Sequence, residues 1–207
     1  MATRDLILVR HGVTDWNVAG RLMGWAVVEL NARGRAEAEA VAEALREVRL
    51  SCVIASPQCR AQETAAVVAR PHGLTVRADP GLAEVWVGDR WQGRTWDDLQ
   101  GEPEILRSLQ DALYRCDQIE PAAAVQDRMV QSAERARAEG GQGSVVLVSH
   151  GDPIKVLLAH YLGMDLAAFR RIVIHTGSVS VVRFSGNGCR LLALNWKLPG
   201  TLLELLA

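Results

Sequence analysis

The sequence lacks several features that mark particular classes of protein. None of its apolar stretches approaches the ~18 residues that a membrane-spanning helix requires, and the apolar run near its start is too short for a secretion signal. Its 4 cysteines form no CxxC pair and show no zinc-binding spacing. We therefore expect a cytoplasmic protein with reduced thiols and no membrane as a partner.

Nucleotide- and metal-binding motifs are also missing. The sequence contains no P-loop, no GxGxxG fingerprint and no nucleophile elbow. Three of its histidines, His72, His160 and His175, do not stand near carboxylates at the spacing of metal ligands. We expect neither a metal site nor a bound cofactor.

An excess of charge of either sign is absent as well. The 23 basic residues face 24 acidic residues, which leaves a formal net charge of −1. Proteins that bind nucleic acids usually carry a marked positive excess, so we expect no nucleic acid as a partner. Only Lys155 and Lys197 are lysines. The other basic residues are arginines, whose planar guanidinium suits phosphate and carboxylate.

Short apolar runs predict the strands of a sheet that is buried on both faces. Such runs occupy residues 6–9, 52–55 and 145–148, and a weaker one occupies 74–77. Residues 179–184 and 189–194 alternate in polarity around a Ser-Gly-Asn-Gly turn and predict a hairpin.

Helical spacing of apolar residues fills the intervals between these strands. Asn31 is the expected N-cap of one helix, and Ser56 followed by Pro57 is expected to begin another that ends near residue 70. Further helices are predicted over 103–118, 121–139 and 152–162. Strands that alternate with helices indicate an α/β fold, a three-layer α/β/α sandwich with a mostly parallel central sheet.

The 207 residues are interpreted as one domain, in which residues 79–143 form a lid of loops and helices. Tryptophans are frequent in this segment and either line a ligand or pack beneath the loop. The apolar residues 202–207 and the hairpin either close the core or pair with a second subunit, and we expect a homodimer.

Cationic and ionisable side chains follow three of the predicted strands. Arg10 and His11 follow the first, Arg60 falls in the first turn of the helix after the second, and His150 follows the run at 145–148. Ligands of open α/β sheets bind beyond the carboxyl ends of the strands. Two guanidinium and two imidazole groups at this edge predict a pocket for an oxyanion such as phosphate.

These residues belong to motifs that resemble the histidine phosphatase superfamily, which includes the cofactor-dependent phosphoglycerate mutases. The motifs come in the order of that family and run from residue 6 to about residue 163. They are Arg10-His11-Gly12 with Thr14, Trp16 and Asn17; Ser56-Pro57 with Arg60, Thr64 and Ala65; Leu82-Ala83-Glu84 with Gly88, Trp91 and Gly93; and Ser149-His150-Gly151.

The resemblance implies a role for each residue of the predicted site. His11 would be the nucleophile that forms a phosphohistidine, and Glu84 would be the general acid and base. The residues expected to hold the phosphoryl group or other parts of the substrate are Arg10, Arg60, His150, Asn17, Thr14, Gly12 and Gly151.

Charge also predicts the protonation states in this pocket. Arg10, Arg60 and His150 would disfavour protonation of His11 and keep its imidazole nucleophilic. The same cations would keep Glu84 ionised until phosphate binds. Asp89 lies in the same loop and is a competing acid, which leaves open a plain surface role for Glu84.

Three functions are compatible with these motifs. The favoured one is an enzyme of the phosphatase branch that needs no metal and hydrolyses small phosphorylated metabolites. An α-ribazole phosphate phosphatase is one candidate subtype. The alternatives are a phosphoglycerate mutase and a non-catalytic phosphate-binding relative. The 65 residues between Glu84 and His150 hold 7 arginines against 11 acidic residues, a net −4 that suits a bisphosphate poorly.

Overall fold

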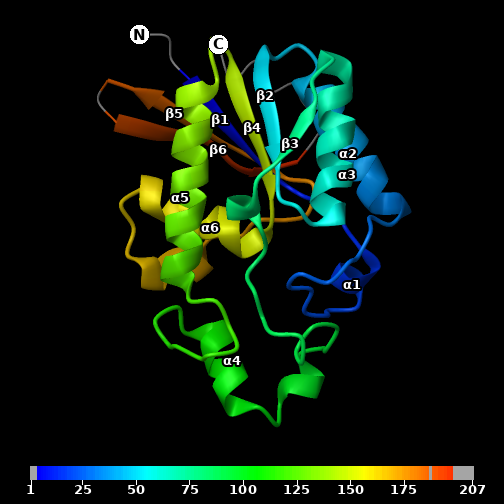
Figure 1. Cartoon of the computed structure of the whole chain (residues 1–207), viewed down its shortest axis with the longest axis vertical. Helices are drawn as coiled ribbons and strands as arrows, with labels where there is room; N and C mark the ends of the chain where they lie inside the picture. The colour runs from blue at the N-terminus through cyan, green and yellow to red at the C-terminus, as the bar shows by residue number, and fades with distance from the viewer. Residues whose placement is uncertain (1–3, 187, 198–207) are drawn as a thin grey trace.

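The apolar runs of the sequence form the middle of a six-stranded sheet in the computed structural model, which describes residues 4–186 and 188–197 (Figure 1). The strand order is β3-β2-β4-β1-β5-β6. The first four strands of the chain run parallel, whereas β5 is antiparallel to β1 and β6 is antiparallel to β5. The strands are β1 (Arg4–Arg10), β2 (Leu50–Ala55), β3 (Val76–Ala78), β4 (Ser144–Ser149), β5 (Val179–Ser185) and β6 (Gly188–Trp196).

Alternate residues of the central strands pack against different helices. Leu6 and Leu8 belong to a core with α5 (Ala122–Glu139) and α6 (Gly151–Tyr161). Ile7 and Val9 belong to a second core with α2 (Ala32–Leu45) and α3 (Cys59–Ala69). Because successive side chains of a strand point to opposite faces, both faces of the sheet are covered. The predicted three-layer α/β fold with a mostly parallel sheet is confirmed.

Shorter elements connect these layers. They are α1 (Asp15–Val18), α4 (Pro103–Gln110) and the 3-10 turns η1 (Arg70–His72), η2 (Pro80–Leu82), η3 (Asp97–Leu99) and η4 (Leu166–Arg171). Within the described residues, no helix is long and apolar enough to span a bilayer.

Two helix boundaries differ from the sequence-based expectation. The predicted helix over 103–118 ends at Gln110, because the side chain of Asp111 accepts a hydrogen bond from the N–H of Leu113 and turns the chain. The helix expected to begin at Ser56 begins at Cys59, and its N-cap Gln58 makes no side-chain capping bond. Asn31 does cap α2 as predicted, since its side chain accepts from the N–H of Gly34.

The segment 79–143 builds a small core of its own beyond the carboxyl ends of the strands. Val87, Trp91, Leu99, Ile105 and Ile119 are its buried members. Figure 1 shows α4 at the lower end of the molecule, away from the strands of the sheet. Trp91 is a buried member of this small core, so it packs beneath the loop. The predicted hairpin is present as β5 and β6, whereas Asn187 of its turn and the tail 202–207 lie outside the described residues.

Candidate active site

His11 follows β1 directly and is fully buried between the ends of the central strands. Its backbone N–H donates to the carbonyl of Ser149, which ties it to β4. Its ring Nδ1 lies 2.7 Å from the carbonyl oxygen of Gly12. A carbonyl oxygen only accepts, so Nδ1 carries the proton. The buried Nε2 atom makes no hydrogen bond within the described residues and presents a lone pair.

Two glycines allow the close chain contact that places this loop. A Cβ atom on Gly12 would stand 2.3 Å from the carbonyl oxygen of Gly34 in α2, and one on Gly34 would stand 2.1 Å from the carbonyl oxygen of Val13. The N–H of Gly12 donates to Oγ1 of Thr64. Gly12 was expected to help hold the substrate, but its N–H instead joins this loop to α3.

Thr14 and Asn17 form a reciprocal cap on α1. The N–H of Asn17 donates to the hydroxyl of Thr14, and the N–H of Thr14 donates to Oδ1 of Asn17. Thr14 is fully buried, whereas Asn17 lines the cavity described below. Thr14 thus orients Asn17 and leaves the amide NH2 group of Asn17 as a donor toward a ligand.

Arg60 is fully buried in the first turn of α3. Its Nη2 donates to the carbonyl of Gly24 at 2.9 Å and its Nη1 to that of Ala26 at 3.2 Å. Its Nε atom makes no hydrogen bond within the described residues. Arg10 is held in a similar way, since its Nη1 donates to the carbonyl of Ile174 at 2.7 Å. Its buried Nε also makes no hydrogen bond within the part of the chain that the structure describes.

His150 precedes α6 and is fully buried. Its Nε2 lies 2.7 Å from the hydroxyl oxygen of Ser56 and 3.1 Å from Oε1 of Gln58. The hydroxyl of Ser56 also bonds Gln58, so it serves His150 instead of capping a helix. The role of Gln58 could not be found from the sequence, because no spacing rule connects it to a residue 92 positions away.

Glu84 stands after η2 with its backbone fixed from several sides. Its carbonyl oxygen accepts from the indole of Trp25 at 2.7 Å and from Arg128 at 3.2 Å, and its Oε1 accepts from the N–H of Val85. Its Oε2 lies 3.7 Å from Nδ1 of His150, and the side chain is 17% exposed. Neither Trp25 nor Arg128 could be assigned this role from the sequence, because both lie far from Glu84 along the chain.

The site lowers the pKa of both histidines. Burial is the main cause for each, and the Arg10 and Arg60 guanidinium groups lower both values further. Both imidazoles are therefore neutral at pH 7, as predicted for His11.

Burial, and not the neighbouring cations, sets the direction of the pKa shift of Glu84. Burial raises the pKa of Glu84, and the nearby carboxylate of Asp152 raises it too, against the opposite effects of Arg60 and Arg10. The removal of the carboxylate from water outweighs the attraction of the cations, so Glu84 holds its proton more readily than an ordinary glutamate.

These side chains converge at the carboxyl ends of three neighbouring strands. The ring centroids of His11 and His150 are 5.1 Å apart, and the Arg10 guanidinium carbon would lie 3.5 Å from a Cβ atom placed on Gly151. Four buried polar atoms without a hydrogen bond in the described residues belong to this group: Arg10 Nε, His11 Nε2, Arg60 Nε and His150 Nδ1. Buried polar groups are nearly always paired, so the two guanidinium N–H groups among these atoms suit an anionic ligand.

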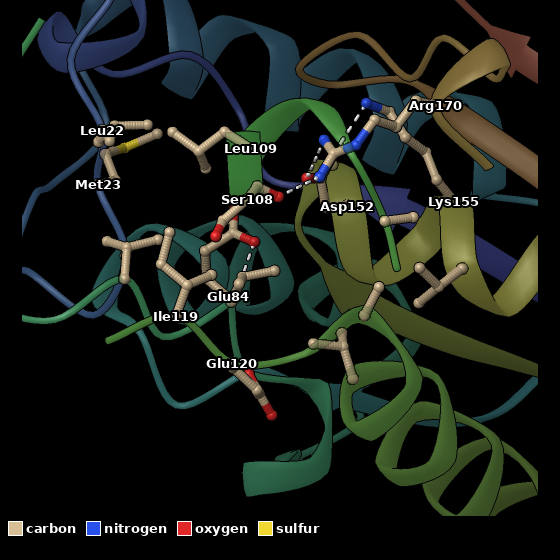
Figure 2. Close-up of a pocket in the computed structure, with 18 of the residues that line it drawn as sticks. Leu22, Met23, Glu84, Ser108, Leu109, Ile119, Glu120, Asp152, Lys155 and Arg170 are labelled. Atoms are coloured by element: carbon tan, nitrogen blue, oxygen red, sulfur yellow. Dashed lines mark hydrogen bonds and ion pairs between the residues drawn. The ribbon is translucent and has the colours of Figure 1, made fainter. Parts of the chain in front are cut away.

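A cavity of about 280 Å³ opens from this cluster (Figure 2). Arg10, Asn17, Glu84 and Gly151 line one part of it. Side chains from segment 79–143 form much of the remaining wall, including Trp96, Leu109, Tyr114, Ile119 and Val125. In the described residues, no group of three or more histidine, cysteine, aspartate or glutamate side chains is placed to hold a metal ion.

Known proteins are similar to this chain over nearly its whole length. The family model described as "Histidine phosphatase superfamily (branch 1)" matches residues 6–197. The acid phosphatase of Mycobacterium tuberculosis strain ATCC 25618 / H37Rv is 32% identical over 194 residues, which are 91% of this chain and 90% of that protein. The "Probable phosphoglycerate mutase GpmB" of Erwinia tasmaniensis is 34% identical over 181 residues, which are 86% of this chain and 84% of that protein.

Solved structures agree with the sequence comparisons. The mycobacterial glucosyl-3-phosphoglycerate phosphatase in complex with VO3 superposes with a TM-score of 0.83 at 29% identity, covering 95% of this chain and 100% of that chain. Phosphatases and mutase-like proteins therefore both occur among the relatives. The chain belongs to the histidine phosphatase superfamily.

Proposed function

We propose that this chain is a cytoplasmic phosphomonoesterase that hydrolyses small phosphorylated metabolites through a phosphohistidine on His11. One observation carries the proposal: Arg10, His11, Arg60 and His150, whose charges act on one another, each keep one buried polar atom that makes no hydrogen bond within the described residues. A phosphoryl group accepts hydrogen bonds from the Nε–H groups of Arg10 and Arg60 and presents its phosphorus to the lone pair on Nε2 of His11.

In the first step, the lone pair on Nε2 of His11 attacks phosphorus. The bond between phosphorus and the leaving oxygen breaks, and Glu84 gives its proton to that oxygen. Its raised pKa supports this role, because the proton must be held until the bond breaks. Arg10 and Arg60 stabilise the negative charge on the phosphoryl oxygens.

In the second step, a water oxygen attacks phosphorus and the bond to Nε2 of His11 breaks. Glu84, now ionised, takes a proton from that water. Inorganic phosphate leaves, and His11 and Glu84 return to their starting states. The hydrogen bond from Nδ1 of His11 to the carbonyl of Gly12 holds the ring in the required tautomer throughout.

Hydrolysis is favoured over phosphoryl transfer by the segment above the site. Its net charge of −4 between Glu84 and His150 gives little attraction for a bisphosphate. The similarity to an acid phosphatase and to a glucosyl-3-phosphoglycerate phosphatase supports the same choice. The similarity to a mutase keeps phosphoglycerate mutase as the alternative.

The test is turnover of p-nitrophenyl phosphate in the presence of EDTA by the wild type and by His11→Ala. We expect metal-independent turnover that falls by about 10³-fold or more in the variant. His160→Ala is the matched control, because His160 is exposed on α6. Mass spectrometry of wild type denatured at alkaline pH should find phosphate on the peptide that contains His11.

Each alternative has its own outcome in the same assay. Interconversion of phosphoglycerates primed by 2,3-bisphosphoglycerate, without release of phosphate, identifies a mutase. Binding of inorganic phosphate without turnover of any ester identifies a non-catalytic relative.

A further inference from the structure

A second polar cluster lies in the same cavity, away from His11. It consists of Asp152 and Lys155 on α6, Arg170 in η4 and Ser108 on α4, and all four line the cavity. Figure 2 shows Lys155 and Arg170 converging on Asp152, with Arg170 also reaching Ser108. The proposed hydrolytic steps use none of these four side chains.

The cluster has more hydrogen-bond donors than acceptors. Lys155 Nζ donates to Asp152 Oδ1 at 3.0 Å, and an ammonium group carries two further protons. Arg170 Nη1 is 3.5 Å from Asp152 Oδ2, and Nη2 donates to the carbonyl of Ser108 at a long 3.3 Å. The buried Nε of Arg170 makes no hydrogen bond within the described residues.

Ser108 adds an independent observation. The residue is only 6% exposed, yet its hydroxyl oxygen is buried without a partner in the described residues. Burial of a polar atom without a partner is unfavourable. An ion pair that served structure alone would therefore not explain why the Ser108 hydroxyl and the Nε–H of Arg170 both lack a partner in the described residues. Two cations, one carboxylate and a hydroxyl instead match a ligand that is negatively charged and rich in acceptors.

The position of the cluster relates it to the phosphate site. Gly151 begins α6 beside Arg10, and Lys155 lies four residues later on the same helix, a rise of about 6 Å. A ligand whose phosphate contacts the start of α6 therefore brings a group a few bonds away to Lys155 and Arg170. Leu109, Ile119 and Val125 line the cavity without charge, and the Nη1 of Arg21, a further cation of the lining, is bonded to the carbonyl of Gly93.

We infer that Arg170, Lys155 and Ser108 form a subsite for a carboxylate on the leaving group, so that the substrate is the phosphate ester of a short hydroxy acid. This inference rests on the proposed phosphatase function. Asp152 holds the two cations in place and competes with the ligand for them. The cluster is thus a specificity device, and the phosphorus chemistry stays with His11 and Glu84.

The experiment compares two esters that differ only where the subsite acts. These are 3-phosphoglycerate, which ends in a carboxylate, and glycerol 3-phosphate, which ends in a hydroxymethyl group. The readout is the ratio of their kcat/KM values, measured by phosphate release. We expect the wild type to prefer the carboxylate by about tenfold or more, as charge-assisted hydrogen bonds predict.

Variants move this ratio in opposite directions if the subsite exists. Arg170→Gln and Lys155→Gln should each lower the preference about tenfold, since each removes a cation that the carboxylate meets. Asp152→Asn should raise it, because the competing carboxylate is gone. Arg171→Gln is the matched control, as Arg171 is the exposed neighbour of Arg170 and does not line the cavity.

A wild-type ratio near one overturns the inference, whatever the variants do. A ratio that Arg170→Gln and Lys155→Gln both leave unchanged overturns it as well. Failure of the proposed function is distinct from either result, because the wild type would then hydrolyse neither ester nor p-nitrophenyl phosphate.

Discussion

Nδ1 of His150 lies 3.7 Å from Oε2 of Glu84, so the second buried imidazole and the proposed proton donor face the same small volume. His150 reaches it from the end of β4 and Glu84 from the loop after η2. A phosphoryl group bound there would lie beside both side chains.

The replacement Glu84→Gln should affect esters according to their leaving group. An alkoxide needs a proton to leave, whereas p-nitrophenolate is stable without one. We expect kcat/KM for glycerol 3-phosphate to fall by about 10²–10⁴-fold, and that for p-nitrophenyl phosphate to fall much less. In the wild type, kcat/KM for the alkyl ester should decline as the pH rises through the raised pKa of Glu84.

Asp89→Asn provides the control, because Asp89 is an exposed acid of the same loop that does not line the cavity. It should leave both esters unaffected. Equal losses on both esters in Glu84→Gln would count against a proton-donor role.

Acid should destabilise the protein through its two buried histidines. Their folded pKa values lie well below the ordinary 6.5, so below pH 6.5 the unfolded chain binds protons that the folded chain does not. The free energy of unfolding should fall with decreasing pH by about 1.4 kcal/mol per pH unit for each histidine. Glu84 acts in the opposite sense nearer its ordinary pKa of 4.5, because its folded pKa is raised.

Urea unfolding between pH 5 and 8 measures this slope. His11→Gln should remove roughly half of it. A slope that is identical in His11→Gln and in the wild type would show that His11 is not a source of the acid sensitivity.

Ser56→Ala should weaken catalysis without removing any group that touches the substrate. The hydroxyl holds Nε2 of His150 at 2.7 Å, and its loss leaves Gln58 as the partner of that nitrogen. We expect kcat/KM for p-nitrophenyl phosphate to fall by about tenfold, in line with one buried hydrogen bond. Ser51→Ala, which removes a hydroxyl that bonds the carbonyl of Ser144, is the control and should retain full activity.

Gly34→Ala should destabilise the fold although alanine favours helices. The added methyl group would stand 2.1 Å from the carbonyl oxygen of Val13, so the loop after His11 must move. We expect a loss of about 1–3 kcal/mol in the free energy of unfolding, together with reduced activity. Gly101→Ala is the control, since its Cβ atom meets nothing within 4 Å. Comparable stability of the two variants in urea would contradict the packing argument.

The sequence predicts the layers and the convergence of Arg10, His11, Arg60 and His150, because apolar strands and the residues after them are local patterns. It does not predict the contacts made across the sheet. Ser56 has a good capping pattern, yet its hydroxyl bonds His150, which is 94 residues away. The helix expected to continue through 118 stops at Asp111, where one side-chain bond outweighs helical spacing.

The protonation of Glu84 shows a different limit. The sequence reveals which charges lie near this carboxylate but not how much water surrounds it. Burial has the larger effect on the pKa of Glu84, so the neighbouring cations alone do not give the direction of its shift. The pairing of Lys155 with Asp152 is visible as helical spacing, whereas the approach of Arg170 depends on how η4 folds back over α6.

The antiparallel pairing of β5 with β1 has a consequence for synthesis of the protein on the ribosome. Arg10 Nη1 donates to a carbonyl 164 residues later, and the N–H of Gly177 lies between the carbonyl oxygens of Arg10 and His11. His11, the proposed nucleophile, is among the first residues to emerge from the ribosome. Ile174 and Gly177, which bond Arg10 and His11, are among the last. A nascent chain that ends before Ile174 carries every proposed catalytic residue without a finished phosphate pocket. Activity should therefore appear late in translation, and the slow closure of such distant contacts delays it further.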